Sequence, residues 1–252
     1  MSFAVPAESY DRFMGRYSTL LAPLFAEFAG IHHGLSVLDV GCGPGALTGE
    51  LVARLGDKGV AAVDPSEPFV AALASRYAGV RVERAAAEAV PFEDGEFDAA
   101  LAQLVVHFMT DPVVGLREMA RVTRPAGVVA ACVWDHAGGQ TPISAFWAAA
   151  RDLDPDLVDE SGLPGARQGH LSELLRTAGL GTVEESLLSV ELAHASFDDW
   201  WEPLTLGVGP AGAYVATLDP DRRATLREHC RSRLPGEPLI VTAQAWAARG
   251  RV

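Results

Sequence analysis

The stretch Val37–Gly45, with the sequence VLDVGCGPG, limits the fold of this chain more than any other part of it. Branched apolar residues and one acid lead directly into a turn rich in glycine. Apolar residues then recur at positions 47, 51, 52 and 55, which is the spacing of one face of a helix. The pattern predicts a strand, a tight loop and a helix. Such a unit opens a doubly wound α/β sheet and brings a ligand to the carboxyl end of the strand.

The chemistry of the loop narrows the choice of ligand. Gly41, Gly43 and Ala46 satisfy the dinucleotide pattern G-x-G-x-x-G/A. A pyrophosphate over this loop needs free backbone N–H donors, and Pro44 has none. The carboxylate of Asp39 suits a ligand ammonium and repels a phosphate. The loop therefore indicates an amine-bearing nucleoside, and an NAD-dependent oxidoreductase is the alternative that Asp39 and Pro44 oppose.

The same stretch resembles the first motif of class I S-adenosylmethionine (SAM)-dependent methyltransferases, of the small-molecule, ubiquinone-biosynthesis-like type. The similarity covers about residues 36–134 and resumes weakly near the C-terminus. It implies an α/β, Rossmann-like, seven-stranded doubly wound sheet in the order 3-2-1-4-5-7-6, with strand 7 antiparallel. We expect one methyltransferase domain over 1–252, an N-terminal helix in 1–30 over the cofactor site, and insertions at 135–169 and 196–236 that form a helical acceptor cap.

Periodicity and turn residues place the individual elements. Arg124-Pro125-Ala126-Gly127 is expected to end the helix before the fifth strand. The expected strands are 37–40, 59–64, 80–83, 97–103, 128–134, 182–192 and 238–246, and the expected helices are 7–29, 46–55, 68–78, 112–122, 143–152 and 170–178.

An acid ends the second expected strand. Asp64 lies nineteen residues after Gly45, close to the roughly 20-residue spacing at which an acid accepts ribose hydroxyls. Alternatively, Asp64 caps the following helix. Pro65 and Ser66 form a small turn that can wall one face of the adenine.

The resemblance implies further contacts with the cofactor. The family often has Asp where this chain has Ala86, so the backbone around Ala87, or Glu88, has to meet the adenine. Gln103 ends the fourth strand, which borders the methionine part of SAM in the family. The full expected cofactor set is Tyr10, Arg16, Asp39, Gly41, Cys42, Gly43, Gly45, Asp64, Pro65, Ser66, Ala87, Glu88 and Gln103.

Tyr10 and Arg16 lie in the opening helix, which closes over the amino-acid end of SAM in the resembled family. Both can meet the cofactor carboxylate, Arg16 through charge-assisted hydrogen bonds. The alternative is an amphipathic helix that only packs on the sheet. Cys42 fits a small packing residue of the loop better than a nucleophile.

Three residues are candidates for handling the methyl acceptor. His107 stands among apolar residues beyond the fourth strand and can act as a general base, or it can simply pack. Trp200 and Trp201 can form walls of an acceptor pocket, or they can belong to the core. The few scattered histidines show no metal-ligand spacing, so no metal is expected.

Composition excludes several classes of protein. The net charge of −13 argues against nucleic acid as a partner. Three cysteines without a C-x-x-C pair suggest reduced thiols and a cytoplasmic location. No signal peptide and no membrane span are expected, and a homo-oligomer is left open.

The expected function is transfer of the SAM methyl group, with S-adenosylhomocysteine (SAH) as product, to a small-molecule O, N or C acceptor. A non-catalytic SAM-binding protein is the second alternative.

Overall fold

The computed structural model describes residues 6–234, 236 and 238–252. Residues 1–5 of the expected N-terminal segment and Pro235 of the second expected insertion lie outside the described residues. The strands are β1 (Val37–Val40), β2 (Val60–Asp64), β3 (Arg81–Arg84), β4 (Phe97–Gln103), β5 (Thr123–Trp134), β6 (Gly181–His194) and β7 (Leu239–Arg251). The α-helices are α1 (Ala7–Tyr10), α2 (Arg16–Phe28), α3 (Ala46–Leu55), α4 (Glu67–Arg76), α5 (Pro112–Val122), α6 (Ser144–Leu153), α7 (His170–Thr177), α8 (Phe197–Trp201), α9 (Gly209–Thr217) and α10 (Pro220–Arg233).

The described strands form one seven-stranded sheet in the order β3-β2-β1-β4-β5-β7-β6. β1 pairs in parallel with β2 and with β4. β7 runs antiparallel to both β5 and β6. The predicted Rossmann-like order and the antiparallel seventh strand are therefore confirmed.

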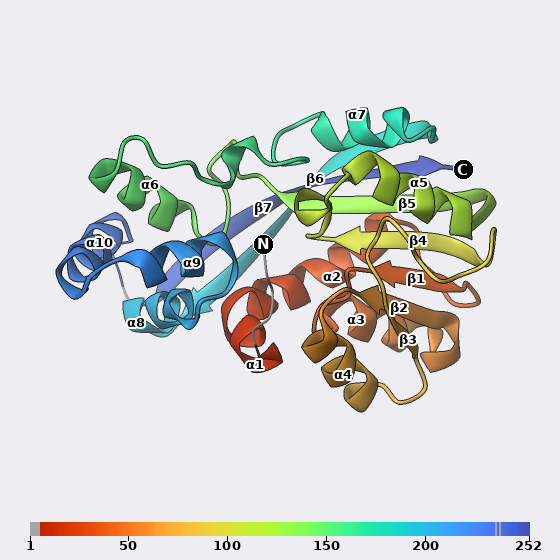
Figure 1. The fold of residues 1–252 in the computed structure, drawn as a ribbon, viewed down its shortest axis with the longest axis horizontal. Coiled ribbons are helices and arrows are strands. Elements are labelled where there is room, and N and C mark those ends of the chain that lie inside the picture. The colour runs from red at the N-terminus through yellow and green to blue at the C-terminus, as the bar shows by residue number, and fades with distance from the viewer. Residues whose placement is uncertain (1–5, 235, 237) are drawn as a thin grey trace.

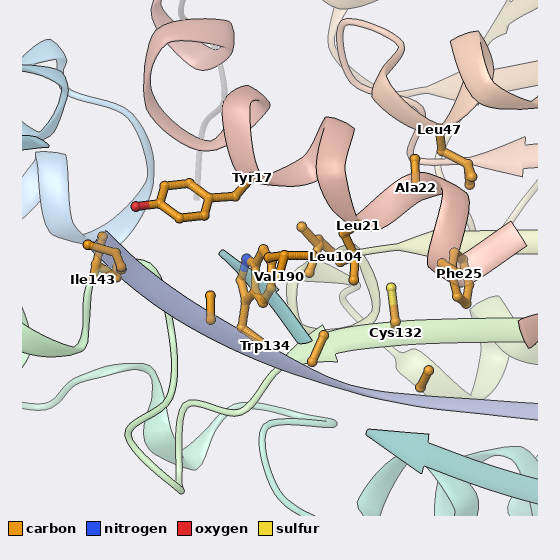
Figure 2. Packing of buried hydrophobic residues seen from close by; sticks show 14 of the residues in the cluster. Tyr17, Leu21, Ala22, Phe25, Leu47, Leu104, Cys132, Trp134, Ile143 and Val190 are labelled. Atoms are coloured by element: carbon orange, nitrogen blue, oxygen red, sulfur yellow. The ribbon is translucent and has the colours of Figure 1, made fainter. Parts of the chain in front are cut away.

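Alternate residues of the central strands enter two separate hydrophobic clusters, as expected for a sheet covered on both faces. In β5, Cys132 and Trp134 belong to the cluster that α2 and α3 cover, while Val133 belongs to the cluster that α5 and α7 cover. Figure 2 shows Leu21 and Phe25 of α2 lying over β5 beside Cys132. The sheet is thus doubly wound, and its central strands β1, β2, β4 and β5 are largely buried on both sides.

The hairpin of β6 and β7 extends beyond the rest of the sheet. β6 has 14 residues and β7 has 13, whereas β1 has four. The pairing of β6 with β7 continues as far as His194 and Leu239. Helices α6, α8, α9 and α10 gather around this extension, at the end of the sheet towards which β4 points (Figure 1). The two expected insertions therefore lie beyond the carboxyl ends of the parallel strands, where a ligand binds in such sheets.

Two elements differ from the sequence-based expectation. The opening helix is interrupted by a π-helical turn at Asp11–Gly15, between α1 and α2. β5 begins at Thr123, so the expected helix stop at 124–127 lies inside the strand. Thr123 pairs with Phe97 of β4, and the next pair in the register is Val128 with Ala99. The extra residues form a bulge opposite β4.

The described helices include none that combines the length and the apolar character needed to cross a membrane.

Candidate functional site

The glycine-rich loop between β1 and α3 depends on backbone conformations that glycine tolerates. Gly41, Gly43 and Gly45 have φ angles of +70°, +53° and +103°. A Cβ on Gly41 would lie 2.5 Å from Val105, and one on Gly45 would lie 2.3 Å from Leu73. A Cβ on Gly43 would have no heavy atom within 4 Å. Side chains therefore pack against the loop at Gly41 and Gly45, whereas the space beside the Gly43 Cα is open.

The backbone N–H groups of this loop are already engaged. The N–H groups of Gly41 and Cys42 donate to the carbonyl of Val63, and the Gly45 N–H donates to Cys42. The Gly43 N–H donates to the carboxylate of Asp64 at 2.9 Å. Because proline supplies no N–H at position 44, the loop has no free backbone donor for a pyrophosphate.

Asp39 is a buried carboxylate at the end of β1. Its side chain is 1% exposed. One oxygen, Oδ2, accepts a hydrogen bond from the Thr48 hydroxyl at 2.6 Å, and the other, Oδ1, has no partner among the described residues. Burial raises the pKa of Asp39 to about 7. A cationic donor placed beside Oδ1 would complete its hydrogen bonding and favour its charged form.

Asp64 ends β2 and faces the same loop. Oδ2 accepts from the Gly43 N–H, and Oδ1 accepts from the Ser66 N–H at 2.8 Å. Burial raises the pKa of this carboxyl as well. Asp64 thus supports the start of α4, whose N-cap residue is Ser66. Each carboxylate oxygen keeps a second lone pair, so support of the helix and acceptance of ligand hydroxyls are compatible.

Cys42 behaves as a packing residue of the loop. It is a free cysteine in the main hydrophobic cluster. Burial is the largest of the effects that raise the pKa of its thiol well above the usual value, so the thiol stays protonated.

The N-terminal segment lies against this region. The Tyr10 ring packs edge-on against Phe69 of α4, with ring centroids 5.6 Å apart. Burial raises the pKa of Tyr10 to about 12, and Asp64 is close enough to contribute to that rise. Gln103, at the end of β4, donates to the backbone carbonyl of Ser18 at 3.0 Å, while its Oε1 has no described partner. The contacts of Tyr10 and Gln103 with a cofactor stay predictions.

The residues expected to contact the adenine make hydrogen bonds within the protein or are buried. The Glu88 carboxylate accepts from the N–H groups of Thr110 and Asp111, at 2.7 and 3.2 Å. Its charge is thus used to fix the turn before α5. Ala87 is buried, and Pro65 accepts from Arg84 through its carbonyl. Their contacts with an adenine stay predictions.

Beside Leu104, which follows β4, lies a partly open cavity of about 40 Å³, which we call the central cavity. Its lining comes from the N-terminal segment, the ends of β4 and β5, and both insertions. Figure 2 shows Leu104, Trp134 and Ile143, which reach it from three separate parts of the chain. The described lining residues are Tyr10, Phe13, Met14, Leu104, His107, Phe108, Trp134, His136, Ile143, Glu160, Val208, Gly209, Pro210 and Ala211.

The polar side chains of this lining meet in one place. His107 lies in a 3₁₀ turn after β4, His136 follows β5, and Glu160 begins a 3₁₀ turn of the first insertion. Burial lowers the pKa of His107 well below its usual value and that of His136 to about 4. Burial raises the pKa of Glu160 to about 7. His107 was expected from sequence, whereas His136 and Glu160 were missed because no local pattern distinguishes them.

The structure gives Arg16 a different partner from the one expected. Its guanidinium binds the carboxylate of Asp199, with Nη1–Oδ1 and Nη2–Oδ2 distances of 2.9 and 3.1 Å. The charge that was assigned to the cofactor carboxylate is therefore neutralised by a protein carboxylate.

Trp200 and Trp201 lie in the core of the cap, and the described lining of the central cavity includes neither of them. The Trp200 indole N–H donates to the carbonyl of Pro142 at 3.0 Å. Trp201 stacks on Phe197, with ring centroids 6.2 Å apart. Both side chains are buried, so their arrangement is that of packing residues.

Comparison with known proteins places this geometry in a family. Residues 38–131 match the family model described as a methyltransferase domain. This segment contains the glycine-rich loop, Asp39, Asp64 and β4. Residues 38–131 are therefore similar to a methyltransferase domain, over less than half of the chain.

Curated relatives are similar to part of the chain in sequence, and solved methyltransferase structures share its fold. Over 129 residues the chain is 34% identical to the malonyl-(acyl-carrier protein) O-methyltransferase of Pseudescherichia vulneris, which covers 51% of this chain and 50% of that protein. A putative methyltransferase of Bacillus halodurans superposes with a TM-score of 0.57 at 15% identity, over 91% of this chain and 97% of the other. Phosphoethanolamine N-methyltransferase 2 of Haemonchus contortus, in complex with S-adenosyl-L-methionine, gives 0.58 at 15% identity, over 97% and 56%. The chain spans about half the length of the first curated relatives that it matches.

Proposed function

We propose that this chain is a SAM-dependent methyltransferase that moves the methyl group of SAM to an oxygen, nitrogen or carbon of a small-molecule acceptor. The observation that carries the proposal is the pair of buried carboxylates, Asp39 and Asp64, on either side of the open Gly43. An ammonium group beside Asp39 Oδ1 supplies the missing hydrogen-bond donor. Ribose hydroxyls can donate to the remaining lone pairs of Asp64.

The same geometry argues against a dinucleotide. Two buried carboxylates repel a pyrophosphate, and the N–H groups of Gly41, Cys42, Gly43 and Gly45 are bonded within the protein. An NAD-dependent oxidoreductase would need those donors. Two of the similar proteins, an O-methyltransferase and an N-methyltransferase in complex with SAM, point to the same class as the site.

SAM, when bound, supplies a sulfonium methyl group that is already activated, so the protein has to place the acceptor and exclude water. The central cavity suits that task because its lining is mainly apolar and it is covered by the N-terminal segment and both insertions. We therefore propose that 135–169 and 196–236 form the acceptor cap. A volume of about 40 Å³ is too small for most acceptors, so we infer that the cap opens to admit one.

Cytoplasmic location is part of the proposal, because the three cysteines are free thiols.

A thermal shift experiment tests the cofactor. SAH at about 100 times its Kd adds about 2.7 kcal/mol to the free energy of unfolding. For a chain of this size we expect the Tm to rise by about 5–10 °C, and NAD at the same concentration should leave it unchanged. A rise with NAD and none with SAH would overturn the proposal.

Asp64→Asn tests the site itself. Replacing the ionised acceptor with an amide should weaken SAH binding by about ten- to a hundredfold, measured by calorimetry. Glu67→Gln is the matched control, because Glu67 lies in the first turn of α4 and its exposed carboxylate pairs only with Arg84 among the described residues. Equal SAH affinities for the two variants would restrict Asp64 to support of the helix.

A turnover assay separates an enzyme from a non-catalytic SAM-binding protein. The purified chain is incubated with SAM and a panel of small hydroxyl, carboxyl and amine compounds, and the SAH formed is measured. Saturable SAH binding without acceptor-dependent SAH formation across the panel would favour the binding protein.

A further inference from the structure

We propose that His107, His136 and Glu160 form a binding site for one divalent transition-metal ion, with Zn²⁺ as its representative, in the wall of the central cavity. Each residue offers one ligand atom, and the three atoms lie within 4.8 Å of one another. The residues come from the segments after β4 and β5 and from the first insertion. The fold therefore brings together two imidazoles and a carboxylate that are far apart in the chain.

Two buried nitrogen atoms in this cluster have no hydrogen-bond partner among the described residues. They are Nδ1 of His107 and Nε2 of His136. The His107 side chain is 94% buried, since its exposed fraction is 6%. Leaving a buried polar atom unpaired costs about 1–3 kcal/mol. Two such nitrogen atoms and one buried carboxylate indicate a bound cation that accepts a lone pair from each of the three groups.

A hydrogen bond from the protein holds the Glu160 carboxylate. Its side chain is buried, and Oε2 accepts a hydrogen bond from the Trp147 indole N–H at 2.9 Å. A hydrogen bond of this kind orients a carboxylate and is a common support for metal ligands. No described cation pairs with Glu160. Its negative charge would therefore be balanced by a bound cation.

The ligand set also suggests which ion binds. Imidazole and carboxylate ligands suit Zn²⁺ and similar transition metals better than Ca²⁺ or Mg²⁺, which prefer oxygen. Around a tetrahedral ion with bonds of about 2.0–2.2 Å, ligand atoms stand about 3.3–3.6 Å apart. The observed 4.8 Å limit requires the side chains to close by about an ångström. Three protein ligands leave a coordination position open towards the central cavity, as in catalytic zinc sites.

The site would deepen the proposed function, on which this step rests, by selecting acceptors with a hydroxyl or carboxyl oxygen. A hydroxyl that coordinates the ion loses its proton to water near neutral pH. In this assignment His107 holds the ion, and no side chain has to act as the general base. His107 would then act on the acceptor through the ion that it binds, and not as a general base.

Metal binding is tested on the full chain after treatment with a chelator and dialysis. Calorimetric titration with Zn²⁺ alone should show one ion per chain. Co²⁺ should bind in competition with Zn²⁺ and give visible absorption bands of low-coordinate Co²⁺. Glu160→Gln keeps an acceptor for Trp147 but removes the charge, and His136→Asn removes a nitrogen ligand. Each should weaken Zn²⁺ binding by about 100-fold or more, because loss of a supporting contact alone costs about 10–100-fold.

His33→Asn is the matched control, since His33 is exposed and lies outside the central cavity; it should bind Zn²⁺ like the unaltered chain. If Glu160→Gln fails to fold, His136→Asn carries the test, because His136 is only partly buried. Absence of stoichiometric Zn²⁺ binding, or equal affinity in His136→Asn and His33→Asn, would overturn the metal site. SAH binding is measured on the same samples. If SAH binds and Zn²⁺ does not, only the metal site is wrong. If Zn²⁺ binds and SAH does not, only the proposed function is wrong.

Discussion

Arg16 of α2 and Asp199 of α8 form a two-pronged ion pair that connects the N-terminal segment to the second insertion. The two N–O distances are 2.9 and 3.1 Å, and the residues are 183 positions apart. His194, at the end of β6, lies against both, and its Nε2 is 2.6 Å from the Tyr17 hydroxyl. Because both connected segments line the central cavity, we expect this pair to help keep the cavity closed.

Asp199→Asn should loosen that closure. The pair is about one-third exposed, so we expect the free energy of unfolding to fall by only about 1 kcal/mol. The dissociation rate of SAH, measured by stopped flow, should rise several-fold because the N-terminal segment opens more often. Asp198→Asn is the control, since Asp198 lies beside Asp199 in α8 but pairs with Arg227. Equal dissociation rates in the two variants would show that the pair does not limit ligand release.

Gly43→Ala should remove cofactor binding while the chain stays folded. Its φ of +53° makes any side chain strained by about 1–2 kcal/mol, but no described atom lies within 4 Å of the new Cβ. Gly34→Ala is matched in both respects, with a φ of +93° and open space, and it lies outside the loop. Both variants should lose similar stability in urea titrations. Only Gly43→Ala should lose SAH affinity in calorimetry, and an unchanged affinity would mean that the open face of the loop is not the ligand side.

Cofactor binding should release a proton from Asp39. In the free protein burial raises the pKa of Asp39 to about 7, so the carboxyl is mostly protonated at pH 6. A ligand ammonium favours the ionised form and lowers that pKa. SAH affinity should therefore increase as the pH rises towards 7 and level off above it. Calorimetry at pH 6 in buffers of different ionisation heat should show about one proton released per SAH bound.

Asp39→Asn supplies the control for this linkage. Its amide cannot ionise, so proton release at pH 6 should disappear even where residual SAH binding is measurable. Proton release of the same size in the variant would assign the titration to another group.

Trp200→Ala should destabilise the cap more than it alters an acceptor site. The side chain is 4% exposed and belongs to the main hydrophobic cluster, and replacing a buried Trp with Ala costs about 3–5 kcal/mol. Trp200→Phe keeps most of the packing and loses mainly the hydrogen bond to Pro142, which is worth about 1 kcal/mol. Denaturant titration distinguishes the two losses. A small loss of stability in Trp200→Ala, together with a raised acceptor KM, would instead restore Trp200 as a pocket wall.

The sequence alone determined the parts of this protein that depend on short-range sterics. Three glycines after an apolar run predicted the strand, the loop and the helix, and the positive φ angles at Gly41, Gly43 and Gly45 confirm the reason. The spacing of Asp64 from Gly45 predicted a ligand role for this acid. In the structure its carboxylate lies against the Gly43 N–H, because neighbouring parallel strands end at the same edge of the sheet. The strand order came from the resemblance to class I methyltransferases, and the sheet confirms it.

The tertiary structure decided which side chains meet. The separations of 29 residues between His107 and His136, and of 24 between His136 and Glu160, match no local ligand pattern. Only the ends of β4 and β5 and the fold of the first insertion bring them together. Arg16 likewise finds its partner across 183 residues. Backbone angles depend on neighbours in the chain, whereas the partner of a buried charge depends on how distant elements pack, and that packing is a property of the whole fold.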